Sequence, residues 1–275
     1  MGDNRVSSLP EFVSAVLDYG NRWAKPDSEP EIWCRGVSDH RIHLLPGAYW
    51  RKNCEEESLF LSFQALVPSY IQQLPNDDWE WYYLMQHHRL PTRLLDWSES
   101  PLVALYFALT NAQGDSLVPA AGALPCVWLM DPGVLNRVTH RLNEEFIFVP
   151  GQPQLEYWLP RFCGRGKMAL KLPQKSDFTD NSKPIAIFPK RHNPRIVAQR
   201  GVFTVHGSDE VSIEEVLRAD SPPAEETRLA QVLIDPGKCE TLLRDLRTLG
   251  LNQSTLFPEP DSVSKDLMRI YNVRP

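Results

Sequence analysis

The sequence predicts an α+β fold in which a single domain spans residues 1–275. The chain has 275 residues, of which 42% are hydrophobic, so it can enclose a large core. Helical spacing of apolar residues dominates the first half, and short apolar runs typical of strands dominate the second. This division favours a helix-rich first half around a central mixed or antiparallel sheet over a regular βαβ alternation.

Apolar periodicity and capping residues predict the helices. A polar residue such as Asp77 or Asp78 suits an N-cap, because its oxygen accepts from backbone N–H groups that have no helical partner. Pro101 suits a first helical position, with Ser98 or Ser100 as the cap. The predicted helices cover residues 9–23, 55–73, 79–85, 101–112, 236–249 and 262–270.

Apolar runs bounded by turn residues predict the strands. They cover residues 31–36, 124–130, 184–188, 195–198, 202–205 and 228–234. Residues 37–54 and 86–97 are expected to be loops, and residues 134–165 show no clear pattern. The 24 prolines are spread along the chain, which favours one domain with long ordered loops over two domains joined by a hinge.

Composition excludes several broad classes. The net charge of −6 argues against nonspecific nucleic-acid binding by the whole surface, although a local basic cleft remains compatible with it. The five cysteines show no Cys-x-x-Cys spacing, which is typical of a reducing compartment. Because no apolar stretch approaches the roughly 18 residues needed to span a bilayer, we expect a cytoplasmic protein without membrane association.

The richest segment chemically is residues 86–97, Gln-His-His-Arg-Leu-Pro-Thr-Arg-Leu-Leu-Asp-Trp. It holds two imidazoles, two guanidiniums, an amide, a hydroxyl, a carboxylate and an indole. A polar loop that leads into a buried helix holds its side chains in place, so we interpret this segment as a functional site. The alternative is a capped turn in which Arg93 and Asp96 pair locally, since ion-pair networks imitate functional clusters.

Common catalytic motifs are absent from the sequence. There is no Gly-x-Gly-x-x-Gly, phosphate-binding loop, His-Glu-x-x-His or Gly-x-Ser-x-Gly pattern. His40, His43, His87, His88 and Asp96 would have to converge to bind zinc, and their spacing is not that of a zinc site, so no metal is predicted.

Four segments in order resemble the FRG domain family, which takes its name from a Phe-Arg-Gly signature. They are Trp-Cys-Arg-Gly at 33–36, the long motif at 86–108, Ala-Gln-Arg-Gly-Val-Phe-Thr at 198–204 and Thr-Leu-Phe-Pro at 255–258. Together they extend the resemblance over about residues 31–267, and residues 1–30 are expected to add an N-terminal helix.

Two positions depart from the family pattern. Cys34 stands where the signature has phenylalanine, which is a modest packing change. Arg89 replaces the usual glycine, so the loop either tolerates a side chain there or has another backbone conformation. The added positive charge is also expected to lower the pKa of His87 and His88.

The resemblance implies a function because the family's fold is similar to that of ADP-ribosyltransferases, which cleave NAD at the nicotinamide bond. It implies an NAD-dependent transferase of bacterial defence or toxin systems, with a protein or a nucleic acid as the macromolecular acceptor. An NAD glycohydrolase would differ only in using water as acceptor. The alternative is a non-catalytic module of the same fold that senses a nucleotide or nucleic acid. Oligomeric state is not predicted.

These functions assign roles to particular residues. Arg35 is expected to anchor the pyrophosphate, because a planar guanidinium makes bidentate phosphate contacts, and Gly36 would let the ligand approach the backbone. Arg93 is either a second phosphate ligand or the partner of Asp96, which is itself a ribose acceptor or a helix cap. The predicted cofactor-binding residues are Arg35, Gly36, His88, Thr92, Arg93, Asp96 and Trp97.

Catalytic roles are predicted for three further side chains, Gln199, His87 and Glu56. Gln199 lies at a predicted strand edge where such transferases often carry an acid, and an amide there can orient a group but cannot ionise. His87 is a candidate base or ribose ligand, and since the adjacent His88 points elsewhere, one of the two is expected to be structural. Glu56 is the alternative carboxylate, or else a residue that complements the helix dipole. Trp97 either stacks on a ring of NAD or belongs to the core.

Overall fold

One seven-stranded sheet forms the centre of the molecule in a computed structural model that describes residues 5–26, 29–110, 117–140, 145–163, 181–220 and 227–273. The strand order is β1-β7-β4-β2-β3-β6-β5. The sheet is mixed, because β1 and β7 are parallel and the other neighbours are antiparallel. The strands are β1 (Arg5–Val6), β2 (Trp33–Val37), β3 (Leu94–Ser98), β4 (Cys126–Met130), β5 (Ile185–Ile187), β6 (Gly201–Val205) and β7 (Leu229–Ile234).

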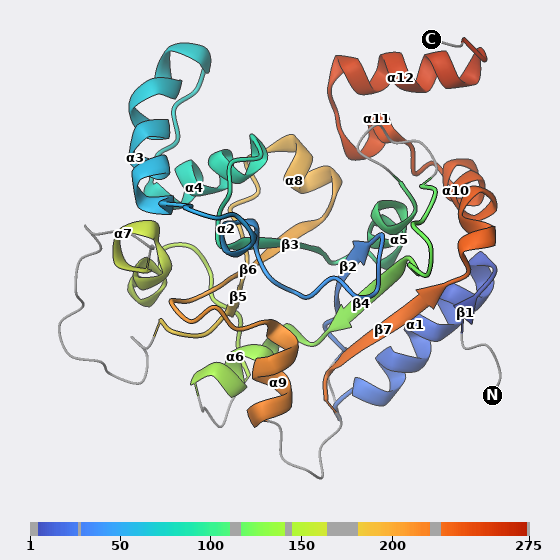
Figure 1. Cartoon of the computed structure of the whole chain (residues 1–275), viewed down its shortest axis with the longest axis horizontal. Helices are drawn as coiled ribbons and strands as arrows, with labels where there is room; N and C mark the ends of the chain where they lie inside the picture. Colours follow the sequence, from blue (N-terminus) through green and yellow to red (C-terminus); the bar gives the residue numbers. More distant parts are fainter. Residues whose placement is uncertain are drawn as a thin grey trace.

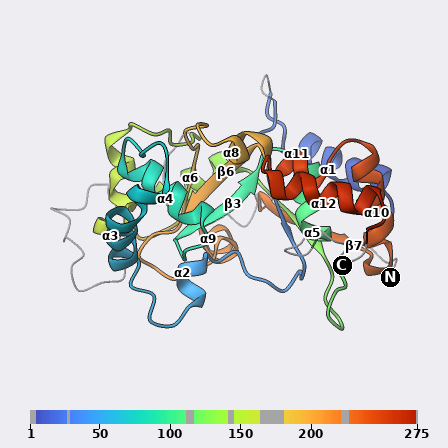
Figure 2. The same cartoon turned by 90° about the horizontal axis from the view of Figure 1, so that it is seen from above.

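Helices cover both faces of this sheet (Figure 1). The α-helices are α1 (Leu9–Trp23), α2 (Gly47–Trp50), α3 (Glu56–Leu66), α4 (Asp78–His87), α5 (Pro101–Leu109), α6 (Pro132–His140), α7 (Pro160–Cys163), α8 (Pro194–Ala198), α9 (Ile213–Asp220), α10 (Cys239–Thr248), α11 (Gln253–Leu256) and α12 (Pro260–Ile270). The 3₁₀ helices are η1 (Val67–Tyr70), η2 (Pro153–Trp158) and η3 (Pro236–Lys238). Figure 2 shows α3 and α10 near opposite ends of the molecule, so the sheet connects two helical regions.

Helix α5 packs on the sheet and is largely buried. Its apolar side chains join those of α1, α10 and the adjacent sheet face in one core cluster. Gly36 on β2 permits this packing, because a Cβ atom there would lie only 1.8 Å from the Ala104 carbonyl oxygen. The close contact fixes β2 against α5, and β2 carries the Arg-Gly pair of the predicted signature.

Several helices begin at the side-chain caps that the sequence contains. Asp77 accepts a hydrogen bond from the backbone N–H of Glu80, which confirms it as the cap of α4. Asn193 accepts from Arg195 in the same way and is followed by Pro194 at the first position of α8. These oxygens satisfy N–H groups that would otherwise lack partners at the helix start.

The predicted strand at 195–198 is wrong. The run Ile-Val-Ala is apolar like a strand, but the cap and proline before it start a short helix, α8. The segment 94–98 was expected to be loop and is β3, next to the central strand β2. Buried and exposed side chains alternate over only three residues here, since Leu95 and Trp97 enter the core and Asp96 is exposed. The polar residues around them made this strand pattern hard to recognise.

The predicted mixed central sheet and the helix-rich first half are confirmed, with α1 to α5 before residue 110, but the expected concentration of strands in the second half is wrong. Four of the seven strands precede residue 131, and helices α8 to α12 follow residue 193. Helix α9 was not predicted, and the end of the helix predicted at 101–112 lies outside the described residues. No helix within the described ranges is long and apolar enough to cross a membrane. All five cysteines are buried free thiols.

Candidate functional site

A cleft opens where the neighbouring strands β2 and β3 separate. The two strands share a single register pair, Cys34 with Ser98. One residue further along β2, the Arg35 guanidinium fills the gap and donates a hydrogen bond to the backbone carbonyl of Asp96 at 2.6 Å. Because Arg35 replaces a missing strand contact, its position is fixed by the sheet itself. The resulting cleft has a volume of about 680 Å³, within the range of small-molecule sites.

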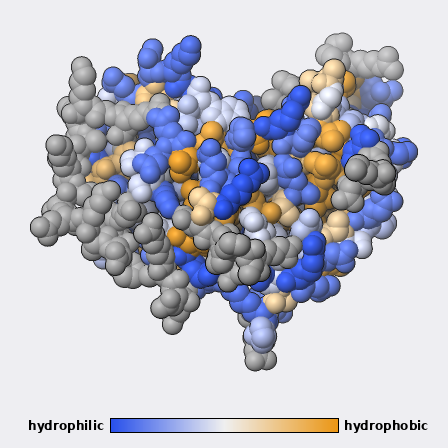
Figure 3. Space-filling view, turned by 60° about the horizontal axis from the view of Figure 1, so that its bottom comes forward, coloured by the Kyte–Doolittle hydropathy of each residue, from blue (hydrophilic) through white to orange (hydrophobic). Residues whose placement is uncertain are grey.

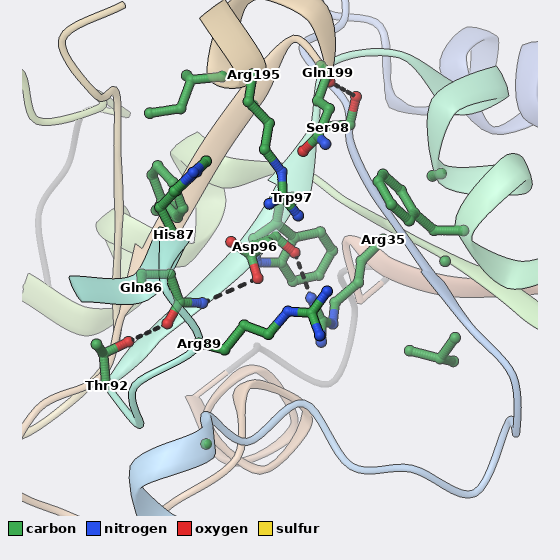
Figure 4. Close-up of a pocket in the computed structure, with 18 of the residues that line it drawn as sticks. Arg35, Gln86, His87, Arg89, Thr92, Asp96, Trp97, Ser98, Arg195 and Gln199 are labelled. Carbon is green, nitrogen blue, oxygen red and sulfur yellow. Dashed lines mark hydrogen bonds between the residues drawn. The ribbon is translucent and has the colours of Figure 1, made fainter. Parts of the chain in front are cut away.

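The cleft is rich in positive charge although the chain as a whole is acidic. Its cationic lining residues are Arg35, Arg51, Arg89 and Arg195. Among the described lining residues Asp96 is the only acid. Figure 4 shows Arg35, Arg89 and Arg195 converging on the space around Asp96 from three different segments. An anionic ligand is therefore favoured in most of the cleft, with room for one positive group beside Asp96.

A chain of two hydrogen bonds orients the Asp96 carboxylate. Thr92 donates from its hydroxyl to Oε1 of Gln86, so the other end of that amide is the donor. The Gln86 Nε2 atom then donates to Oδ2 of Asp96 at 3.0 Å (Figure 4). The carboxylate is thus fixed on one side, and its other oxygen accepts no side-chain hydrogen bond that the structure shows. An ionised carboxylate can only accept, so it suits a hydroxyl or a developing positive charge.

Burial and neighbouring charges shift the pKa of several cleft residues. Burial lowers the pKa of Arg35 and of Arg195, and the Asp96 carboxylate opposes both shifts. Arg89 lowers the pKa of Arg195 further. Burial also lowers the pKa of His87, with Arg195 and His88 adding to the effect. The expected direction at His87 is therefore correct, although its causes are burial and Arg195, and the imidazole is largely neutral at pH 7.

Gln199 lines the same cleft, but it caps the C-terminus of α8 and does not lie on a strand edge. Its Nε2 atom donates to the Leu256 carbonyl at 3.1 Å. Its own backbone carbonyl accepts from the Ser98 hydroxyl at 2.7 Å (Figure 4). These two bonds hold the side chain in place, and the amide oxygen is the group that it can present to a ligand.

The backbone of Arg89 shows whether the loop keeps the conformation of the usual glycine or has another one. Its φ of 64° lies in the left-handed region, which is the conformation that glycine adopts at low cost. The loop therefore keeps a glycine-type backbone and tolerates the arginine. This costs on the order of 1–2 kcal/mol for a residue with a Cβ atom.

The structure does not bring Glu56 and Arg93 to the cleft. They form a buried ion pair, with Nε of Arg93 2.6 Å from Oε2 of Glu56. The two terminal nitrogens of Arg93 donate to the carbonyls of His206 and Trp158, both at 2.5 Å. Tyr82 donates to Glu56 as well. The side chain of Arg93 is 1% exposed, so its role here is to join three segments of the fold.

Three other predicted residues serve packing. His88 caps the C-terminus of α4 with its ring 6.1 Å from that of Phe63, and it does not line the cleft. Trp97 borders the cleft, but its indole is buried and donates to the Thr204 hydroxyl at 3.1 Å. Gly36 makes room for α5, which is a different reason for a glycine from the ligand approach expected above.

Gln86 and Arg195 are two cleft residues whose roles are not apparent from the sequence. Gln86 was visible as part of the long motif, but only its distance from Asp96 reveals that it orients the carboxylate. Arg195 was assigned to a strand, and the Asn-Pro pair before it was the signal that would have placed it on a helix. Among the residues that the structure describes, no group of three or more metal-ligating side chains is present.

Comparisons with known proteins identify one family. No curated protein and no solved structure matches the chain. Residues 30–116 match the family model of the FRG domain. The matched range contains β2 and the whole segment 86–97, which supply Arg35, Gln86 and Asp96 to the cleft. The chain therefore contains an FRG domain, and the residues of that domain build one wall of the candidate site.

Proposed function

We propose that the cleft binds NAD and that the protein is an NAD-dependent ADP-ribosyltransferase. The observation that carries the proposal is the convergence of Arg35, Arg89 and Arg195 around a single oriented carboxylate, Asp96. NAD has the matching charges, since its pyrophosphate is anionic and its nicotinamide ring is cationic. Arg35 and Arg195 would hold the pyrophosphate by charge-assisted hydrogen bonds.

The reaction makes few chemical demands on the protein. The bond between C1′ of the ribose and the nicotinamide nitrogen breaks, and its electron pair leaves with neutral nicotinamide. The acceptor then forms a bond to C1′ through its nucleophilic atom and releases a proton. Asp96 would stabilise the positive charge that develops on the ribose, and it or water would take the proton. Gln199 would orient the ribose or the acceptor through its amide oxygen.

The same proposal covers the biological setting that the family resemblance implies, a bacterial defence or toxin system with a macromolecular acceptor. Its simplest test is growth, because an active transferase of this kind is expected to slow an expressing bacterial host. An Asp96→Asn variant should remove that effect while the protein accumulates to the same level. Equal growth with the wild-type and variant proteins would contradict the toxin setting.

The decisive experiment separates binding from chemistry. Calorimetric titration with NAD should show binding to the wild type and a loss of about two orders of magnitude for Arg35→Ala, because each charge-assisted contact contributes about 1.5–3 kcal/mol. The variant should remain folded and lose only about 1–2 kcal/mol of stability, since Arg35 makes one hydrogen bond within the protein, to the Asp96 carbonyl. Released nicotinamide, measured chromatographically, should fall far more than NAD affinity in Asp96→Asn.

A non-catalytic nucleotide-binding module is the second candidate. It is favoured by one observation: the other predicted carboxylate, Glu56, is buried in an ion pair, so Asp96 acts without a second acid. NAD binding without any nicotinamide release, in the presence of cell lysate as a source of acceptors, would establish this module and contradict the transferase. Unchanged NAD affinity in Arg35→Ala would contradict both.

A further inference from the structure

The rim of the cleft carries an exposed aromatic side chain. Trp50, the last residue of α2, lines the cleft and is 57% exposed. The next two residues are Arg51, which also lines the cleft, and the exposed Lys52. On the face seen in Figure 3, hydrophilic side chains lie between the apolar patches, and the upper outline is hollowed between two raised ends. An exposed indole flanked by cations is a recognition element more than a packing element.

The rim is held rigidly to the segment that carries Arg89. The backbone N–H of Ala48 donates to the Thr92 carbonyl at 3.0 Å. Gly47 lies against Pro91, since a Cβ atom added to this glycine would be 3.9 Å from Pro91 Cα. On the other side Tyr49 donates from its hydroxyl to the Gly207 carbonyl. Helix α2 and the 89–92 loop therefore form one surface, which we call the cleft rim.

Arg89 lies on this rim in a strained backbone conformation, and no contact of its side chain within the described part of the chain offsets the strain. Its backbone has a positive φ, and its guanidinium makes no hydrogen bond or ion pair with the described part of the chain. Burial is not the compensation either, because the residue is exposed. A strained residue without an intramolecular partner at the edge of a cleft points to a ligand.

We infer that the cleft rim binds a nucleotide unit of a single-stranded nucleic acid, which is then the acceptor of the proposed transfer. Trp50 offers a ring face on which any base can stack, and Arg51 and Arg89 reach the phosphates on either side. Stacking aromatics combined with a basic groove is how proteins hold single strands without reading their sequence. This inference rests on the proposed function for the transfer step, whereas the binding step stands alone.

The binding step is tested with a fluorescein-labelled ten-nucleotide single strand of mixed sequence, as DNA and as RNA, followed by anisotropy at low salt. Trp50→Ala and Arg89→Gly should each weaken binding about tenfold or more. The matched controls are Tyr271→Ala, an exposed aromatic outside the cleft, and Arg200→Gly, a second exposed arginine with a positive φ. Both controls should bind the strand within twofold of the wild type.

Calorimetry with NAD distinguishes the cleft rim from the proposed NAD site around Arg35 and Asp96, which belongs to the same cleft. NAD affinity should change less than threefold in Trp50→Ala. If that variant loses NAD and the strand together, the indole stacks on the adenine of NAD and the acceptor assignment is overturned. Absence of binding of either strand to the wild type, or of any difference between the rim variants and their controls, would also overturn it.

Incubation with NAD labelled in the adenylate moiety tests the transfer step. Label on the oligonucleotide supports the inference, and label only on lysate proteins contradicts it. Tight strand binding without nicotinamide release would leave the rim as a nucleic-acid site and count against the proposed transferase alone.

Discussion

Two arginines of neighbouring segments, Arg35 and Arg93, have opposite environments. Arg93 belongs to a buried ion-pair network with Glu56, where its guanidinium is bonded to a carboxylate and two backbone carbonyls. Arg35 stands in the gap between β2 and β3 with one bond to the Asp96 carbonyl. The first is saturated by the protein, whereas the second retains donors for a ligand.

The difference shows that not every polar residue of a dense motif belongs to the functional site. Within residues 86–97 the chain passes from the end of α4 through a tight loop into β3, so successive side chains point to different surroundings. Gln86 and Asp96 meet in the cleft, and Arg93 enters the interior between them in sequence. Chemical richness predicted that this segment matters, but not which of its members face a ligand.

The largest effect should come from breaking the buried network. Arg93→Met leaves the Glu56 carboxylate buried without its cation, and the loss of one partner of such a pair costs about 3–5 kcal/mol. Urea denaturation should therefore show a much lower free energy of unfolding. Arg35→Ala removes only one hydrogen bond to a backbone carbonyl, so it should lose only about 1–2 kcal/mol.

The double variant Glu56→Gln with Arg93→Met is the control for this comparison. It leaves no buried charge, so it should recover part of the lost stability. A single variant Arg93→Met that unfolds at the wild-type urea concentration would show that the pair is not structural, and the contrast between the two arginines would fail.

The sequence predicted much of this fold from local signals. Apolar periodicity located α1 and the long apolar helix α5, and Asp77 marked the start of α4. It failed at β3 because the strand is five residues long and one of its central side chains, Asp96, is exposed in the cleft. Pairing with β2 and β6 stabilises that segment, and such long-range contacts leave no periodic pattern in the chain.

The candidate site was predictable as a set of segments and not as a set of contacts. The cleft does join Arg35, Gln199 and part of the 86–97 segment, but His88 and Arg93 do not line it. The assignment of Glu56 depended on its position in the first turn of a helix, where its burial against Tyr82 and Arg93 was not visible. Glu56 and Arg93 are 37 residues apart in sequence, so their pairing is visible only when the position of helix α3 in the fold is known.

A second prediction concerns His206, a buried residue on which the charges of both Arg93 and Arg35 act. Burial lowers its pKa to about 3, and the positive charges of Arg93 and Arg35 contribute. Below pH 6.5 the unfolded chain takes up a proton at this residue that the folded protein does not. Stability should therefore fall by about 1.4 kcal/mol per pH unit from this residue as the pH drops from about 6.5 towards 3.

Urea denaturation at pH 6.5, 5.5 and 4.5 measures this dependence, with His206→Phe as the comparison. Phenylalanine keeps a ring against Tyr49, which contacts the imidazole edge-on at 5.9 Å. In the variant, the free energy of unfolding should depend less steeply on pH, by about 1.4 kcal/mol per pH unit. Parallel slopes for the two proteins would mean that His206 titrates normally and that the buried region admits more water than the structure indicates.

The smallest predicted effect tests the strain at the edge of the cleft. Arg89→Gly should stabilise the protein by about 0.5–1 kcal/mol, because relief of the left-handed backbone exceeds the entropy that glycine loses on folding. Arg200→Gly should gain a similar amount for the same reason. Arg89→Ala distinguishes strain from charge: it removes the repulsion with Arg195 but keeps a Cβ atom, so it should gain little. If alanine stabilises the protein as much as glycine does, the native arginine destabilises the protein through like-charge repulsion in the cleft and not through backbone strain.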